Sequence, residues 1–211
     1  MTVFPVIVFF GIGWIMVQRF ALAASAGVEL ARAGPADMNE GTRCQVASFA
    51  ELGYRELAVY EARFSGGKFS LVVMAGPGGT AWAEVTDRLW EVASTFGPRL
   101  LRTVTRSMLP PGPTLVQCVR SAPPRIIVAE HERALALLAE RGLSPDRLED
   151  HEILARFESE TRAAQALLRR SMARTALELA WRRPLALHHG RPALAADPCA
   201  GTRIDAWLGT R

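Results

Sequence analysis

The sequence predicts an α+β fold: an N-terminal transmembrane helix, then an antiparallel β-meander of five or six strands, packed by two C-terminal helices, the last one long. Three observations support this. The chain opens with an uncharged apolar run, its middle alternates short apolar segments with tight turns, and its last third spaces apolar residues helically. The 211 residues are 49% hydrophobic and 22% charged, which is typical of a globular protein and excludes a wholly disordered chain.

We expect four parts: a transmembrane anchor at 1–26, a linker at 27–44, an α+β globular domain at 45–184 and a loosely ordered C-terminal tail at 185–211. Met1–Gln18 has no charged side chain. A helix of that length covers about 27 Å, close to the ~30 Å hydrocarbon core of a bilayer. Arg19 can reach the interface while apolar residues continue beyond it, so residues 2–24 are interpreted as one helix in the lipid bilayer.

Other interpretations of the first residues remain open. A cleavable signal peptide is one, because Ala21-Leu22-Ala23 and Ala24-Ser25-Ala26 resemble cleavage sites, although no basic segment precedes the apolar run. A buried core helix and a misassigned start are the others. For an anchor, Arg19, Arg32 and Arg43 on the C-terminal flank favour a single-pass protein of the cell membrane with its N-terminus outside and the globular domain in the cytoplasm.

The middle of the chain predicts strands. Residues 46–52 first form a short helix that ends at Gly53. Ser65-Gly66-Gly67 and Gly76-Pro77-Gly78-Gly79 are turn sequences, and tight turns between closely spaced strands indicate an antiparallel meander. The strand candidates are residues 56–64, 68–75, 81–86, 89–96, 100–108 and 114–120.

Two helices follow Pro123-Pro124. The first covers residues 125–141 before Gly142, and the second covers residues 148–183 before Pro184, with an apolar stripe at steps of three and four. We expect both helices to cover one face of the sheet. Beyond them, Ile204, Trp207 and Leu208 are candidates for docking the tail onto the domain.

Charge gives limited information about partners. The net charge is +4, with Lys68 as the only lysine, and GC-rich codons explain the excess of arginine. Acidic residues gather at the start of the second helix and basic residues at its end, which matches the helix macrodipole. An alternative is that the basic end contacts anionic lipid headgroups. The residues concerned are Arg169, Arg170, Arg174, Arg182 and Arg183, and no nucleic-acid partner is expected.

Histidines and glycines supply the first candidates for chemistry. His131-Glu132 and His151-Glu152 lack the second histidine of a zinc-protease motif, although the two histidines flank the connection between the helices and can approach each other. Surface positions are the ordinary interpretation for both. His188-His189 lies in the tail without evident metal-binding partners. The segment Gly76–Thr80 lacks the lysine of a phosphate-binding loop and is interpreted as a hairpin turn.

Cysteines add no clear site. Cys118 lies in a predicted strand, whereas Cys44 and Cys199 lie outside regular structure, and no base can be paired with any of them. An odd number of cysteines without a close pair does not suggest a disulfide framework. Catalytic residues therefore stay unassigned, and no metal or cofactor is expected.

These observations favour a single-pass membrane-anchored protein whose cytoplasmic domain is a non-catalytic interaction or scaffold module. One alternative is a cup that binds a lipid or small apolar ligand, with the sheet curling around the long helix; the order of elements is similar in outline to cup-shaped lipid-binding folds. Another is an exported protein with a cleaved signal peptide. An enzyme would require His131 or His151 beside a carboxylate in a cleft.

Overall fold

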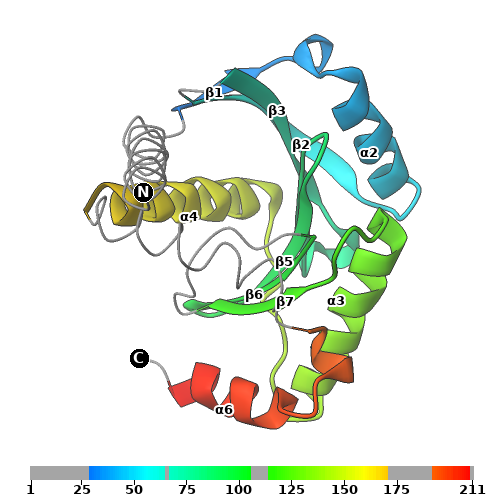
Figure 1. Cartoon of the computed structure of the whole chain (residues 1–211), viewed down its shortest axis with the longest axis vertical. Coiled ribbons are helices and arrows are strands. Elements are labelled where there is room, and N and C mark those ends of the chain that lie inside the picture. Colours follow the sequence, from blue (N-terminus) through cyan, green and yellow to red (C-terminus); the bar gives the residue numbers. More distant parts are fainter. Residues whose placement is uncertain (1–28, 65–66, 106–113, 171–191, 210–211) are drawn as a thin grey trace, which may run out of the picture.

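A computed structural model of the chain describes residues 29–64, 67–105, 114–170 and 192–209 (Figure 1). Within these residues the chain is α+β, with one seven-stranded, mostly antiparallel sheet in the order β1-β2-β3-β4-β5-β6-β7. Every strand of the sheet therefore lies beside its neighbours in sequence, as in a meander. The strands are β1 (Glu29–Ala33), β2 (Arg55–Phe64), β3 (Gly67–Ala75), β4 (Trp82–Val85), β5 (Trp90–Phe96), β6 (Arg99–Val104) and β7 (Thr114–Cys118).

The predicted strands are confirmed, with two differences. β1 is an additional strand inside the expected linker, and it pairs with β2 from Glu29 opposite Arg63 to Ala33 opposite Val59. β7 runs parallel to β6 instead of antiparallel, with Leu100 opposite Thr114. The remaining neighbouring strands are antiparallel.

Four α-helices lie among the described residues: α2 (Glu40–Ala50), α3 (Pro124–Ala139), α4 (Asp150–Arg170) and α6 (Ala200–Gly209). α2 starts earlier than the pattern predicted, because the side chain of Asn39 caps it by accepting from the backbone N–H of Thr42 at 2.8 Å. α3 matches the prediction within two residues. α4 lies within the predicted second helix, whose residues 171–183 fall outside the described part of the chain.

The prediction that both C-terminal helices cover one sheet face is wrong. Ile127 of α3 packs with Val59 and Val72. Ile153 and Phe157 of α4 pack instead with Tyr60 and Val73, the next residues along the same two strands. Alternate residues of a strand point to opposite faces, so α3 and α4 lie on opposite sides of the curved sheet, as Figure 1 shows. α2 shares the face of α3.

Residues 140–149 carry the chain from one face to the other around the end of the sheet. The backbone N–H of Asp146 donates to the Thr95 carbonyl at 2.8 Å, and the Asp146 carboxylate accepts from the N–H of Gly97 at 2.7 Å. The N–H of Leu148 donates to the Gly79 carbonyl at 2.8 Å. These bonds to two sheet turns fix where α4 begins.

The described part of the expected tail is folded. Ile204 and Trp207 are buried and Leu208 is partly buried, in a cluster with Leu101, Leu115 and Leu138, which confirms the predicted docking. The Arg203 guanidinium donates to the Val116 carbonyl of β7 at 2.6 Å, and that of Arg99 donates to the Leu208 carbonyl at 2.6 Å. α6 therefore packs against the edge of the sheet that β6 and β7 form.

Candidate functional site

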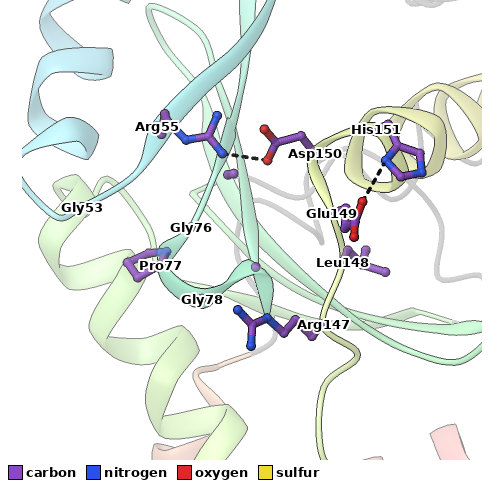
Figure 2. A pocket seen from close by; sticks show the side chains of 12 residues that line it. Gly53, Arg55, Gly76, Pro77, Gly78, Arg147, Leu148, Glu149, Asp150 and His151 are labelled. Atoms are coloured by element: carbon purple, nitrogen blue, oxygen red, sulfur yellow. Dashed lines mark hydrogen bonds and ion pairs between the residues drawn. The ribbon is translucent and has the colours of Figure 1, made fainter.

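A cleft of about 800 Å³ opens where three segments meet at one end of the sheet. These are the start of β2, the β3–β4 turn and the residues that lead into α4 (Figure 2). Its lining consists of Gly53, Arg55, Ala75, Gly76, Pro77, Gly78, Gly79, Arg147, Leu148, Glu149, Asp150 and His151.

The glycine-rich wall is required by close backbone packing. Gly76–Gly79 forms the turn between the antiparallel strands β3 and β4, which confirms the hairpin interpretation. Gly79 has a φ of +71°, and a Cβ there would lie 2.6 Å from the Leu148 carbonyl oxygen. A Cβ at Gly76 would lie 2.9 Å from the Ala81 carbonyl oxygen. Gly79 thus allows the segment before α4 to cross the turn, whereas Gly76 allows the turn itself to close on Ala81. Backbone packing accounts for these glycines without a bound phosphate.

One ion pair spans the cleft. Arg55 Nη2 at the start of β2 lies 2.7 Å from Asp150 Oδ1 at the start of α4 (Figure 2). The hydrogen bond with Arg55 holds the pKa of Asp150 below its usual range, and that bond likewise raises the pKa of Arg55. Both side chains are more than half exposed, so the pair positions α4 while contributing modestly to stability.

Further charged side chains lie along the α4 approach. In Figure 2 the Arg147 side chain extends beside the turn at Gly78, and Glu149 lies next to His151. Glu149 Oε2 is 3.5 Å from His151 Nδ1. The cleft therefore offers guanidinium, carboxylate and imidazole groups to a polar ligand. Its lining residues include no serine, cysteine, lysine or tyrosine that would act as a nucleophile.

His131, the other candidate histidine, lies on the opposite face of the sheet, in the core. Its side chain is 1% exposed on α3. Nε2 lies 2.9 Å from Ser94 Oγ of β5, and Nδ1 lies 2.8 Å from Thr103 Oγ1 of β6. The prediction of a surface histidine is therefore wrong for His131, whereas His151 is exposed. The two histidines lie on helices that cover opposite faces, so the sequence-based idea of their meeting is also wrong.

The hydrogen bonds around His131 fix its tautomer. Ser94 Oγ donates to the Thr80 carbonyl at 2.7 Å, so it accepts from His131 Nε2–H. Gln117 Nε2 donates to Thr103 Oγ1 at 2.6 Å, so the Thr103 hydroxyl proton points to His131 Nδ1. Burial lowers the pKa of His131 to about 3. The ring is thus neutral, with both nitrogens bonded, and serves the core.

The same chain of bonds reaches the C-terminal segment. Gln117 Nε2 also donates to the Glu130 carbonyl at 3.0 Å, and its Oε1 accepts from the N–H of Leu194 at 2.8 Å. These two partners fix the orientation of the Gln117 amide. One continuous network therefore joins β5, β6, β7, α3 and the segment before α6.

A second polar cluster, on the concave face with α4, was missed by sequence reasoning. Glu84 of β4 lies opposite Glu91 of β5, and Arg102 of β6 ion-pairs with both, at 3.5 Å from Glu84. Trp82 Nε1 donates to Glu84 Oε1 at 3.1 Å. Alternation along β5 places Glu91 on the same face as Ala93, but its pairing with β4 and β6 cannot be inferred from the local sequence pattern. Glu84 and Glu91 share Arg102 as their ion-pair partner, so these half-buried charges are accounted for by pairing within the sheet.

The other predicted positions give no site in the described residues. Cys44 lies on α2 and Cys199 just before α6, both exposed, and Cys118 at the end of β7 is half-buried; all three are free. No group of metal ligands occurs in the described ranges. His188-His189, Arg174, Arg182 and Arg183 lie outside them, as do residues 2–24, while Arg169 and Arg170 belong to the last turn of α4.

No helix in the part of the chain that the structure describes is long and apolar enough to cross a bilayer. No protein-family model, curated protein or solved structure matches the chain.

Proposed function

We propose that the chain is a single-pass membrane-anchored protein whose cytoplasmic α+β domain is a non-catalytic interaction module. The observation that carries this proposal is the uncharged run Met1–Gln18, which is long enough for a bilayer helix and stands a few residues before the folded domain. The edge strand β1 begins at Glu29, so such a helix would hold the domain directly at the membrane.

The proposal is non-catalytic because most of the candidate acid and base side chains already have hydrogen-bond or ion-pair partners within the domain. His131 is neutral and both of its ring nitrogens bond to core hydroxyls. Asp150 is engaged by Arg55, and Glu84 and Glu91 by Arg102. His151 does lie beside Glu149 in the cleft, but their side chains are 77% and 81% exposed, so solvent surrounds both groups. A catalytic acid or base is instead held in position facing a substrate. The cleft beside Arg147 is instead suited to a charged, polar segment of a partner protein.

The alternative of an apolar-ligand cup is less well supported. α4 lies in the concavity of the sheet, and Ile153 and Phe157 are each 1% exposed against Ala58, Tyr60 and Val73. The aromatic rings of Tyr60 and Phe157 lie 5.2 Å apart between centroids. The space over β2 and β3 that an apolar ligand would need is therefore filled by the helix.

Native cysteines allow a direct test of anchoring and orientation. Cys44 and Cys199 are exposed, so a membrane-impermeant maleimide should reach them wherever the domain faces the reagent. We expect no labelling in intact spheroplasts of a bacterial host, and labelling after the membrane is permeabilised. The Cys44→Ser/Cys199→Ser variant is the matched control that reports residual labelling of Cys118. Intact mass of the membrane fraction should correspond to the complete 23.0 kDa chain.

Labelling of Cys44 and Cys199 before permeabilisation would contradict the cytoplasmic orientation. If the mass also lacked the residues up to Ala23 or Ala26, the chain would be an exported protein with a cleaved signal peptide. A full-length chain found wholly outside the membrane fraction would contradict the anchor itself.

A further inference from the structure

We infer that β1 pairs edge to edge with β1 of a second copy of this chain, in antiparallel orientation and with Ala31 on the twofold axis. The paired sheets would then form one continuous sheet across the two copies. This inference goes beyond the proposed function, because it concerns the edge of the sheet and stands whether or not the first residues lie in a bilayer.

The strand registers identify the backbone groups of β1 that point away from the sheet. Alternate residues of an antiparallel strand bond to alternate neighbours. The N–H of Gly76 bonds the Ala81 carbonyl, and counting from this pair through the registers of β3 and β2 makes Ala31 a residue that bonds to β2. The N–H and C=O groups of Leu30 and Arg32 therefore point outward.

These four backbone groups of Leu30 and Arg32 form a short open edge. Within the described ranges, no residue outside β2 makes a backbone hydrogen bond to β1. The next outward-facing residue, Gly34, is closed by Asp37, whose carboxylate accepts from the Gly34 N–H at 2.8 Å and whose N–H donates to the Gly34 carbonyl at 3.0 Å. The pairing of β1 with β2 contains no bulge that would turn the edge away. Such an edge is a template for another strand.

The opposite edge of the sheet, at β7, is covered instead. The Arg203 guanidinium of α6 donates to the Val116 carbonyl at 2.6 Å, and the N–H of Leu194 donates to the Gln117 side chain at 2.8 Å. Figure 1 shows β1 at the rim of the sheet, far from α6. Edge-to-edge pairing is therefore directed to β1.

A second β1 satisfies all the open groups at once. With Ala31 opposite the partner's Ala31, Leu30 lies opposite the partner's Arg32, and the twofold axis repeats this pair. Both pairs are then hydrogen-bonded pairs, in which each residue gives its N–H and its C=O to the other. The outward groups of Leu30 and Arg32 are thus bonded in both copies, and neither copy has to change its pairing with β2.

The side chains also fit this register. Alanine, a small residue, lies on the axis, and the half-buried Leu30 lies beside the alkyl stem of the partner's Arg32. The Arg32 guanidinium is held over its own sheet, 5.5 Å from the centre of the Tyr60 ring and 3.7 Å from Glu158. Glu29 lies opposite the partner's Ala33. No two like charges are directly opposite each other, which would be destabilising.

Cysteine cross-linking tests the register. The full chain, with its three native cysteines changed to serine, would carry Ala31→Cys or Glu29→Cys, both at exposed positions. A non-hydrogen-bonded pair has Cα atoms about 4.5 Å apart, within the range of a disulfide, so Ala31→Cys should give a disulfide-linked dimer under mild oxidation. Glu29→Cys is the matched control, because two such residues would lie four steps, or about 13 Å, apart along the strands. A mixture of Glu29→Cys and Ala33→Cys chains should again cross-link.

A charge variant tests the pairing without cysteines. Ala31→Lys places the new charge opposite the carboxylate of Glu61 in its own β2, so the fold is retained, but it brings two ammonium groups together on the twofold axis. In sedimentation of the full chain in detergent, we expect the native chain to form dimers and Ala31→Lys to dissociate at several-fold higher concentration. Ala36→Lys, at an exposed position in the turn after β1, adds the same charge and should behave as the native chain.

Three outcomes would overturn the inference: a chain that stays monomeric and does not cross-link at position 31, cross-linking as strong at position 29 alone as at position 31, or dimers that Ala31→Lys leaves intact. Pairing of the edge with a strand of a different protein would belong to the first outcome. Register-specific cross-linking of a chain found outside the membrane fraction would instead support the pairing and contradict the anchor.

Discussion

At His131, neighbouring hydroxyl and amide groups determine which imidazole nitrogen carries the proton. Ser94 can only accept from Nε2–H because its own proton is given to the Thr80 carbonyl. A single-sequence pattern shows the histidine at an apolar spacing of α3, but not the Ser94 and Thr103 hydroxyls that meet it from two strands. That spacing with Ile127, Ala134 and Leu138 points to burial, whereas the hydrogen-bond partners of His131 could not be predicted from the sequence.

Burial of a neutral His131 makes stability fall in mild acid. The unfolded chain binds a proton at this ring below a pKa of about 6.5, whereas the folded chain does so only near 3. The unfolded state thus holds more protons between these values, and the free energy of unfolding decreases as pH falls through that window. From pH 7.5 to pH 5 we expect a loss of about 2 kcal/mol in denaturant titrations.

The His131→Leu variant separates this effect from other titrating groups. Ser94 and Thr103 lose their partner, so we expect a variant about 2–4 kcal/mol less stable at pH 7.5. The difference between wild type and variant should shrink toward pH 5, because only the wild type titrates at this position. A difference that stays constant with pH would show that His131 is not buried in its neutral form.

Gly78 and Gly79 form a matched pair for testing the cleft wall. Both have φ near +70°, but a Cβ at Gly78 meets nothing within 4 Å, whereas one at Gly79 meets the Leu148 carbonyl oxygen. Gly78→Ala should cost about 1 kcal/mol from backbone strain alone, and Gly79→Ala clearly more. Equal unfolding midpoints in urea for the two variants would mean that Leu148 does not pack closely on the turn.

Among the elements, α4 depends on a small apolar contact. In its first three turns Ile153 and Phe157 are fully buried, and Leu154 is partly buried against the same cluster. The other contacts are polar, with Arg55, Arg32, Tyr60 and the Pro98 carbonyl. Its stripe of apolar spacing was readable from the sequence, but the face of the sheet it covers was not. The hydrogen bonds of Asp146 and Leu148 to the sheet turns determine that face.

Phe157→Ala should therefore loosen α4 strongly. Removing a buried phenylalanine costs about 3–5 kcal/mol, and here it also removes the ring contact with Tyr60. Ser159→Ala, at an exposed position two residues further along α4, is the control and should change stability little. Hydrogen exchange across residues 150–160 should accelerate in Phe157→Ala alone; unchanged protection would show that other contacts hold the helix.

Strands β1 and β7 show what local patterns miss. The sequence of β1, ELARA, contains no β-branched or aromatic residue, so its strand state depends on pairing with β2. The direction of β7 depends on how it pairs with β6, which the local pattern of residues 114–120 does not reveal. By contrast, β2 to β6 carry their own turn signals and were predicted within a few residues.

At the scale of the whole molecule, the direction of strand β2 relates the cleft to the opposite end of the sheet. β2 and α4 share an axis with the cleft at one end and Arg63 and Lys68 at the other. The fold class and most elements followed from the sequence, because apolar alternation and helical spacing are local. The cleft did not, because it joins residues 53–55, 75–79 and 147–151, which only the packed sheet and the crossing segment bring together.

The position of β1 also has a mechanical consequence. A force that pulls Glu29 along the direction of β1 acts at right angles to the hydrogen bonds between β1 and β2, because those bonds lie across the strand. Such a pull shears the five paired residues together, so their resistance adds, instead of opening them one after another. Arg32 shares the load with α4 through Glu158. A pull on Glu29 would thus be transmitted to the helix whose start lines the cleft, before the sheet edge yields.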